Sequence, residues 1–182
     1  MRVITGSARG RRLKTPQGNA VRPTADSVKE AVFNIISSDI EGRRVLDLFA
    51  GTGQLGIEAL SRGASHAVFT DSSRDSVRLI RENISTCGFE GVSEVHLTDA
   101  VSFLSSCGKF DVVFIDPPYD SGLYGEVYRN INLFDILTEG GIIITESRRE
   151  YTLPEFTFPY VLYREYNYGR VKITVYTRKS EK

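Results

Sequence analysis

The chain has 182 residues, of which 41% are hydrophobic, and its 23 basic and 23 acidic side chains leave no formal net charge. This length and composition predict one domain with a sizeable core. They exclude a transmembrane chain, because no apolar stretch is long enough to span a bilayer, and the net charge gives no sign of a nucleic-acid partner.

Charge is nevertheless distributed unevenly. Residues 1–25 contain six basic and no acidic residues, and such asymmetry indicates a phosphate-binding arm. We expect two short extended segments, Arg2–Thr5 and Arg12–Thr15, on either side of a flexible basic loop. Four arginines are predicted to bind phosphates: Arg9, Arg11, Arg12 and Arg22. On charge alone, a solvated hairpin explains the segment equally well.

The two cysteines, Cys87 and Cys107, lack the spacing of a metal site. The N-terminus also lacks the apolar run of a signal peptide, so we expect a reduced, cytoplasmic protein. Nothing in the sequence requires more than a monomer.

We divide the chain into a basic arm, residues 1–23, and a domain, residues 24–182. Arg22-Pro23-Thr24 is expected to open the first helix, with a capping box over residues 27–30, although Thr24 or Asp26 could cap it instead. The apolar stripe of this helix is expected to be Ala31, Val32, Ile35 and Ile36.

A buried strand beginning near Arg44 then runs into a glycine-rich turn and a helix. Gly51, Gly53 and Gly56 have the G-x-G-x-x-G spacing of nucleotide sites, placed between a strand and a helix as such a site requires. The pattern alone does not distinguish a turn that binds pyrophosphate from one that packs against a nucleoside.

The second strand, His66–Thr70, ends at Asp71. Asp71 lies 20 residues after Gly51, the distance at which an acidic side chain reaches ribose hydroxyls. It could instead cap the next helix, Arg74–Thr86, but Ser72 or Ser73 can fill that role. We therefore favour binding of the ribose hydroxyls as the role of Asp71.

A third strand, Val92–Leu97, leads to Asp99 and Ala100. Asp99 could accept the exocyclic amine of adenine, or it could equally cap a helix over residues 100–106. Acidic residues thus fall in or at the ends of four predicted strands: Asp47, Asp71, Asp99 and Asp116. This pattern indicates a polar or cationic ligand, and we predict no metal site because three of these residues have better single-ligand explanations.

The most specific motif is the apolar strand Phe110–Ile115 followed by Asp116-Pro117-Pro118-Tyr119. Neither proline can donate a backbone hydrogen bond, and each biases the preceding residue toward extended conformations. A carboxylate, a carbonyl and a ring are therefore presented at a strand's C-terminal end, where ligands bind in open α/β sheets. The two acceptors suit an amino group and the ring suits a flat base, whereas a buried strand-end turn is the structural alternative.

Beyond this turn we expect a helix over Tyr124–Leu137 and a strand over Ile142–Thr145. Two final strands, Tyr160–Tyr168 and Val171–Arg178, are expected to form an antiparallel hairpin. A parallel sheet closed in this way matches the methyltransferase architecture, in which the last strand inserts antiparallel beside strand five, better than a dinucleotide dehydrogenase.

On these motifs the chain resembles the RsmD family, the S-adenosylmethionine-dependent 16S ribosomal RNA guanine-N2 methyltransferases. The resemblance rests on Arg9-Gly10-Arg11, Arg22-Pro23-Thr24, residues 45–53, Asp116-Pro117-Pro118-Tyr119 and Tyr168-Gly169. It implies an α/β, Rossmann-like class I fold with a seven-stranded, mainly parallel sheet and an antiparallel terminal hairpin. Asp71 departs from the family, which more often has glutamate there, and Gln54 is an unusual residue after the glycines.

The resemblance also implies roles for individual residues. The residues expected to bind S-adenosylmethionine are Asp47, Phe49, Gly51, Gly53, Asp71, Ser72, Asp99 and Ala100. Among them, Asp71 would hold the ribose hydroxyls, Asp99 the adenine amine, and Asp47 would lie near the methionine end. Asp116 and the Pro117 carbonyl would orient the target amine while Tyr119 stacks on the flipped guanine. The implied partner is 16S rRNA, within a small ribosomal subunit or an assembly intermediate, with no membrane.

We expect direct in-line methyl transfer. An aspartate of ordinary pKa is a weak base at neutral pH, so orientation is the expected role of the aspartate in the turn. Asp-Pro-Pro-Tyr also suits methylation of adenine N6 in DNA or RNA, or of a glutamine amide in proteins. The glycine spacing allows a nicotinamide dehydrogenase, and a non-catalytic RNA-binding module is a further alternative.

Overall fold

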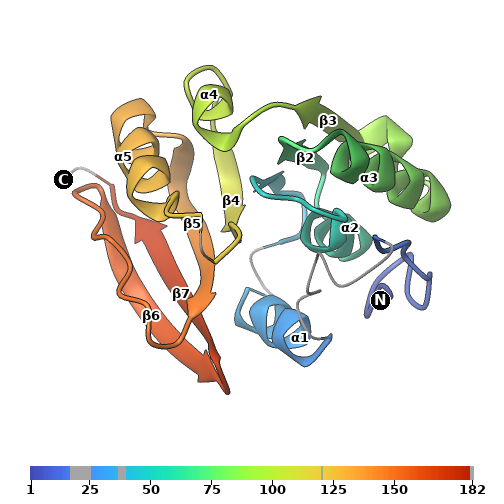
Figure 1. Cartoon of the computed structure of the whole chain (residues 1–182), viewed down its shortest axis with the longest axis horizontal. Coiled ribbons are helices and arrows are strands. Elements are labelled where there is room, and N and C mark those ends of the chain that lie inside the picture. The colour runs from blue at the N-terminus through green and yellow to red at the C-terminus, as the bar shows by residue number, and fades with distance from the viewer. Residues whose placement is uncertain (17–25, 37–39, 120, 181–182) are drawn as a thin grey trace.

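A computed structural model describes the chain except for residues 17–25, 37–39, 120 and 181–182. The described residues form three layers around one seven-stranded sheet, in the order β3-β2-β1-β4-β5-β7-β6. Helices α1, α2 and α3 cover one face and α4 and α5 cover the other, each over its own apolar core (Figure 1). Among the described residues, no helix is long and apolar enough to cross a membrane.

Five strands of this sheet are parallel: β1 (Arg44–Asp47), β2 (His66–Asp71), β3 (Ser93–Leu97), β4 (Phe110–Ile115) and β5 (Leu137–Arg148). Strand β7 (Val171–Arg178) lies antiparallel between β5 and β6 (Tyr160–Tyr168). The predicted fold class is therefore confirmed. The chain progresses outward from β1 to β3 and then returns to β4, so the order reverses between β1 and β4, where open α/β sheets bind ligands.

The helices are α1 (Asp26–Ile35), α2 (Gln54–Ser61), α3 (Arg74–Cys87), α4 (Ala100–Leu104) and α5 (Tyr124–Phe134), with a short 3₁₀ turn at Glu90–Val92. In α3 the buried residues Val77, Ile80 and Ile84 recur at helical spacing, so this face packs on the sheet. The predicted opening of the first helix at Arg22-Pro23-Thr24 lies outside the described residues.

Several predicted boundaries are wrong. The fifth helix ends at Phe134 rather than Leu137, because Asp135 adopts a left-handed conformation with φ of 45° and accepts side-chain hydrogen bonds from Lys109, Tyr160 and Arg178. These contacts with distant parts of the chain fix the break. Strand β5 then spans Leu137–Arg148 and is longer than the predicted strand Ile142–Thr145. The helix predicted over residues 100–106 is also shorter and ends at Leu104.

The described part of the basic arm, residues 1–16, is packed against the domain, and the two segments expected to be extended meet in a single bridge. An isolated antiparallel bridge joins Arg2 to Arg12, and Val3, Ala8 and Leu13 are buried. The loop between them bonds to the last turn of α2, where the Ser7 N–H donates to the Ser61 carbonyl at 2.8 Å. A Cβ on Gly6 would lie 1.7 Å from that carbonyl oxygen, so only glycine fits this contact.

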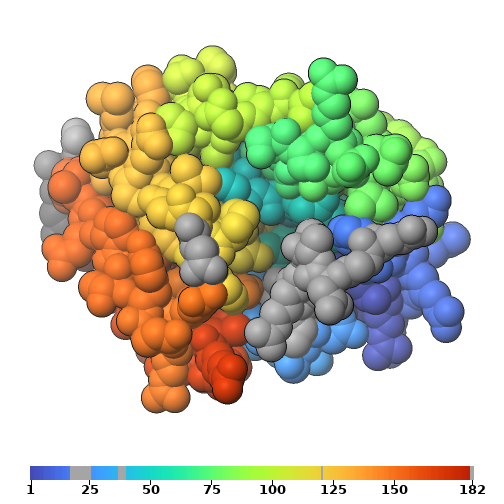
Figure 2. All heavy atoms as spheres, in the orientation of Figure 1, coloured from blue at the N-terminus to red at the C-terminus, as the bar shows by residue number. Residues whose placement is uncertain are grey.

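A buried charge cluster anchors the arm. Glu58 of α2 accepts the N–H groups of Ile4 and Thr5 at 2.8 and 3.0 Å and lies 3.6 Å from Lys29 of α1. Neither Glu58 nor Lys29 is exposed to solvent. Glu58 also accepts a bond from Arg62 Nε at 2.9 Å, and Lys29 donates to the Arg2 carbonyl at 2.7 Å. Because buried charges must be paired and hydrogen-bonded, the arm's backbone adds to the bonds that stabilise this cluster. In the space-filling view, the described part of the arm, residues 1–16 in blue, and the red-orange β6–β7 hairpin lie on opposite sides of the molecule (Figure 2).

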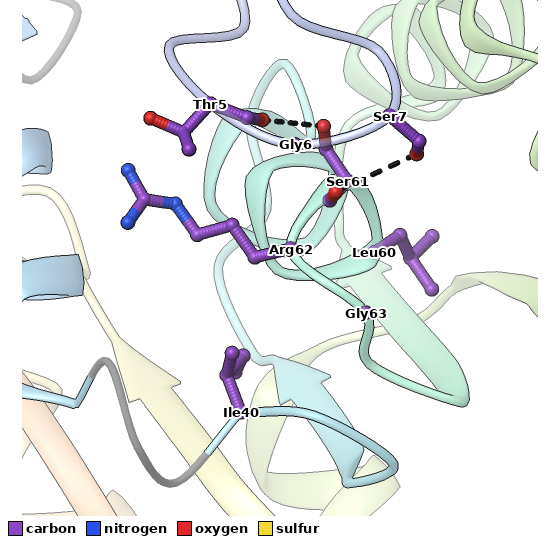
Figure 3. A pocket seen from close by; sticks show the side chains of 8 residues that line it. All are labelled: Thr5, Gly6, Ser7, Ile40, Leu60, Ser61, Arg62 and Gly63. Atoms are coloured by element: carbon purple, nitrogen blue, oxygen red, sulfur yellow. Dashed lines mark hydrogen bonds between the residues drawn. The ribbon is translucent and has the colours of Figure 1, made fainter.

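A surface pocket of about 440 Å³ lies where the arm meets the last turn of α2 (Figure 3). Its lining residues are Thr5, Gly6, Ser7, Ile40, Leu60, Ser61, Arg62 and Gly63. This pocket is at the opposite end of α2 from the glycine turn, and no predicted site residue lines it.

Candidate active site

The predicted strand-end acids meet at one edge of the sheet. Strand β1 ends at Asp47, β2 at Asp71, and β4 leads directly into Asp116. Because β1 pairs in parallel with both β2 and β4, the carboxyl ends of all three strands face the same side. This edge includes the point where the strand order reverses, so topology places these acids where the sequence predicted a site.

The glycine turn lies between β1 and α2. Gly51 and Gly53 have positive φ values of 55° and 77°, which favour glycine. A Cβ on Gly51 would meet no atom within 4 Å, so open space lies beside this residue. Gly56 serves packing instead, since a Cβ there would lie 2.2 Å from the Phe69 ring. The turn therefore combines an open face for a ligand with a close helix–strand contact.

Asp71 holds the glycine turn against the end of β2. Its carboxylate accepts the Gly51 N–H at 2.9 Å and the Ser73 N–H at 2.8 Å. Ser73, not Asp71, caps α3 by accepting the Ser76 N–H. The alternative role of Asp71 as the helix cap is thus filled by a neighbouring serine, as the sequence allowed.

Asp47 lies beneath the same turn and is only 2% exposed. Its carboxylate accepts the Gly56 N–H at 3.0 Å. Burial raises the pKa of Asp47 to about 7, and the negative charge of Asp71 acts in the same direction while the bond from Gly56 opposes it. A cation placed nearby would favour the charged form of this carboxylate, which suits the predicted position beside a cationic ligand.

The remaining residues predicted to bind the cofactor have less distinctive surroundings. Asp99 caps α4 by accepting the Ser102 N–H at 2.8 Å, and this bond lowers the pKa of Asp99. The cap alternative is therefore observed, although a carboxylate can accept further hydrogen bonds. Ala100 is buried, Ser72 is exposed, and Phe49 is half-buried against the core under α4 and α5.

The Asp-Pro-Pro-Tyr turn lies beside the end of β5. Ile115 pairs with Thr145, and each is followed directly by a residue of this region, Asp116 beyond the end of β4 and Glu146 within β5. Pro117 is buried, while Asp116 and Tyr119 are half-buried. The Tyr119 hydroxyl donates to Glu146 Oε1 at 3.0 Å.

Two further residues of this region were not found by sequence reasoning. Glu146 is only 8% exposed, and its carbonyl accepts the Tyr124 hydroxyl at 2.8 Å. Burial raises the pKa of Tyr124, and Asp116 heads the nearby groups whose charge adds to this shift. Arg148 lies over Tyr119, with its guanidinium carbon 5.3 Å from the ring centroid. Only the register between β4 and β5 reveals these neighbours, because they lie 27 and 29 positions from Tyr119 in the sequence.

The described arm arginines make none of the contacts given above for the strand-end cluster. Arg9, Arg11 and Arg12 are exposed, but Ser7 and Ala8 contact Ser61 at the end of α2 that is remote from the glycine turn. Arg22 lies outside the described residues. Other parts of the arm reach the glycine turn: the Thr52 hydroxyl donates to Met1 Sδ at 3.5 Å, and Asn83 bonds to the backbone of both Lys14 and Thr52.

Comparisons with known proteins agree with this geometry. A family model described as "Conserved hypothetical protein 95" matches residues 1–177. "Putative rRNA methyltransferase YlbH" of Bacillus subtilis is 39% identical, over 98% of this chain and 100% of that protein. "Ribosomal RNA small subunit methyltransferase D" of Escherichia coli is 35% identical, over 100% of this chain and 91% of that protein. The solved structure of "Putative methyltransferase yhhF" from Escherichia coli has a TM-score of 0.89 at 36% identity and covers 100% of this chain and 99% of its own.

Proposed function

We propose a function from the family to which the chain belongs, which is described as Conserved hypothetical protein 95 and includes relatives of ribosomal RNA small subunit methyltransferase D. The proposed reaction is methylation of the exocyclic N2 of a guanine in 16S rRNA, with S-adenosylmethionine as the methyl donor. The observation that carries the proposal is the Asp116-Pro117-Pro118-Tyr119 turn, which lies at the sheet edge beside the glycine turn. A methyl donor and a flat amine can meet there.

The glycine-turn residues fit the proposed cofactor. Open space beside Gly51 gives a nucleoside room to approach the backbone, and Asp71 at the end of β2 is placed to accept ribose hydroxyls. Asp47 would lie near the cationic methionine end, with Phe49, Gly53, Ser72, Asp99 and Ala100 around the nucleoside. When bound, the cofactor supplies a methyl group already activated on a sulfonium.

The protein's own contribution to the reaction is mainly position. An exocyclic base amine is a poor nucleophile because its lone pair is delocalised into the ring. Asp116 and the Pro117 carbonyl would accept hydrogen bonds from the two N–H groups of this amine and so direct its lone pair toward the methyl group. Tyr119 would stack on the flipped base.

We further propose that the RNA is bound within a small ribosomal subunit or an assembly intermediate, in the cytoplasm. The arm, residues 1–23, would bind phosphates through its exposed arginines, and the domain, residues 24–182, would carry the chemistry. An arm of this size is too small to select one guanine among many, so the folded rRNA would supply part of the recognition.

Methyl transfer from labelled S-adenosylmethionine tests the proposal. Unmodified small ribosomal subunits, deproteinised rRNA and duplex DNA would be offered in parallel, and the labelled nucleoside would be identified after digestion. We expect N2-methylguanosine from subunits or rRNA. Label in N6-methyladenine would contradict the proposed base, and no label from any substrate would contradict the proposed activity.

A further inference from the structure

We propose that Glu146 determines the base specificity of this site, by accepting the N1–H of the target purine and thereby selecting guanine over adenine. This inference rests on the proposed function, because it concerns the same target base. It assigns a role to a buried carboxylate that the sequence motifs did not identify.

Strand pairing places Glu146 beside the candidate amine-binding group. Ile115 of β4 pairs with Thr145 of β5, and the following residues are Asp116 and Glu146. Neighbouring strands lie about 4.8 Å apart, which is close enough for side chains from both to reach one base. On a purine, the exocyclic amine and N1 are joined through a single ring carbon. Two acceptors on adjacent strands can therefore face two adjacent positions on one base.

The contact with Tyr119 indicates how a base would lie relative to this carboxylate. Glu146 Oε1 is 3.0 Å from the Tyr119 hydroxyl, and so lies at the hydroxyl edge of the ring. A base stacked on that ring would have its own edge next to Glu146. Arg148, two residues further along β5, lies over the same ring, so β5 holds Tyr119 at both its edge and its face.

The chemistry of the base then determines the selection. Guanine has a hydrogen-bond donor at N1 beside its amine, whereas adenine has an acceptor at N1 beside its own amine. An ionised carboxylate only accepts hydrogen bonds and has about four sites for them, so bonds from Tyr119 and from a base N–H are compatible. With adenine, the N1 acceptor would face the Glu146 carboxylate with no proton between them. Burying two acceptors against each other disfavours binding of this base.

The test compares guanine with 2-aminopurine, which keeps the 2-amino group but has an acceptor at N1. The guanine methylated by the wild-type protein would be mapped first, and 2-aminopurine would then be placed at that position by RNA ligation. We expect the wild-type protein to prefer guanine by roughly 100-fold. Glu146→Gln can still accept from Tyr119 but can also donate to N1, so its preference should fall to within about 3-fold or reverse.

Tyr119→Phe is the matched control, because it removes the hydroxyl that contacts Glu146 but keeps the ring and the carboxylate. It should retain the wild-type preference for guanine. An unchanged preference in Glu146→Gln would overturn the inference while the proposed function stands. Equal wild-type rates on both bases would overturn it even if the variant fails to fold, whereas absence of any guanine methylation would remove the proposed function and this inference together.

Discussion

The two halves of the candidate site are held in different ways. In the cofactor half, each acid at the ends of β1, β2 and β3 accepts backbone N–H groups: Asp47 from Gly56, Asp71 from Gly51 and Ser73, and Asp99 from Ser102. In the acceptor half, the tyrosines that follow β4 bond to Glu146 of β5. In the cofactor half the acids bond to backbone N–H groups of the turns that follow β1, β2 and β3, whereas the acceptor half depends on β5 lying beside β4.

This difference separates two consequences of mutation. Changes in the cofactor half should alter cofactor affinity or the stability of the glycine turn. Changes in the acceptor half should alter methyl transfer while leaving cofactor binding intact. Each prediction below either isolates one half or tests whether the two are independent.

Replacing Asp116 should have the largest effect. Asp116→Ala removes the carboxylate that would orient the target amine, so turnover should fall by about 1,000-fold, while the Kd for S-adenosylmethionine stays within about 3-fold of wild type. Single-turnover assays and calorimetric titration measure the two quantities. Asp75→Ala, on the exposed surface of α3, serves as the control and should change neither. Near-normal turnover in Asp116→Ala would refute the assignment.

Asp47 should make stability depend on pH. Its folded-state pKa of about 7 exceeds that of an unfolded aspartate, so its stabilising contribution is present below about pH 4 and is lost as the pH rises to about 7. The loss is at most roughly 4 kcal/mol. Asp47→Asn does not ionise but can still accept the Gly56 N–H.

Urea unfolding of both proteins at pH 5 and pH 8, without cofactor, measures this effect. The stability of Asp47→Asn relative to wild type should increase between pH 5 and pH 8. Because all other titrating groups are the same in the two proteins, their contributions cancel in the difference between the two unfolding free energies. The same difference at both pH values would show that Asp47 has no raised pKa in the folded protein.

Replacing Asp71 should produce the opposite pattern to replacing Asp116. Asp71→Ala removes the acceptor of the Gly51 N–H and of the proposed ribose contacts, so cofactor affinity should fall by about 30-fold, the combined effect of several lost hydrogen bonds. Turnover at saturating cofactor should change only a few-fold. A loss of turnover with unchanged affinity would mean that the two halves are not independent.

Substitutions of single arginines in the arm should have the smallest effects, and these should appear in RNA binding. Arg9→Ala, Arg11→Ala and Arg12→Ala should each lower the salt dependence of RNA binding by about one unit of slope, because each removes one phosphate contact. Lys179→Ala carries the same charge change at the C-terminal end of the chain, beyond β7, and is the matched control. Slopes identical to wild type in all three variants would indicate that the arm arginines are only solvated.

The features of the site that could be predicted from the sequence are those whose contacts are local or follow from the strand order. The glycine turn, the Ser73 cap and the strand Phe110–Ile115 were predictable because their determinants are local. The strand-end acids could be gathered at one edge because parallel topology requires it. The sequence thus predicted the local structure around the glycine turn, while cofactor binding by these residues stays a prediction.

Contacts between distant segments account for what was missed. The end of α5 depends on Asp135 bonding to Lys109 and Arg178. The docking of the arm was not predicted, because nothing nearby in the sequence reveals that Glu58 accepts the N–H groups of Ile4 and Thr5. Glu146 escaped notice because only the strand register places it beside Tyr119.

The most direct measurement is a crystal structure with S-adenosylhomocysteine, the demethylated cofactor. The account predicts the nucleoside over Gly51 and Gly53, the ribose hydroxyls within hydrogen-bond distance of Asp71, and the sulfur facing the Asp116-Pro117 turn. Tyr119 should keep its contact with Glu146. A nucleoside bound elsewhere, or a sulfur directed away from that turn, would contradict the division of the site into a cofactor half and an acceptor half.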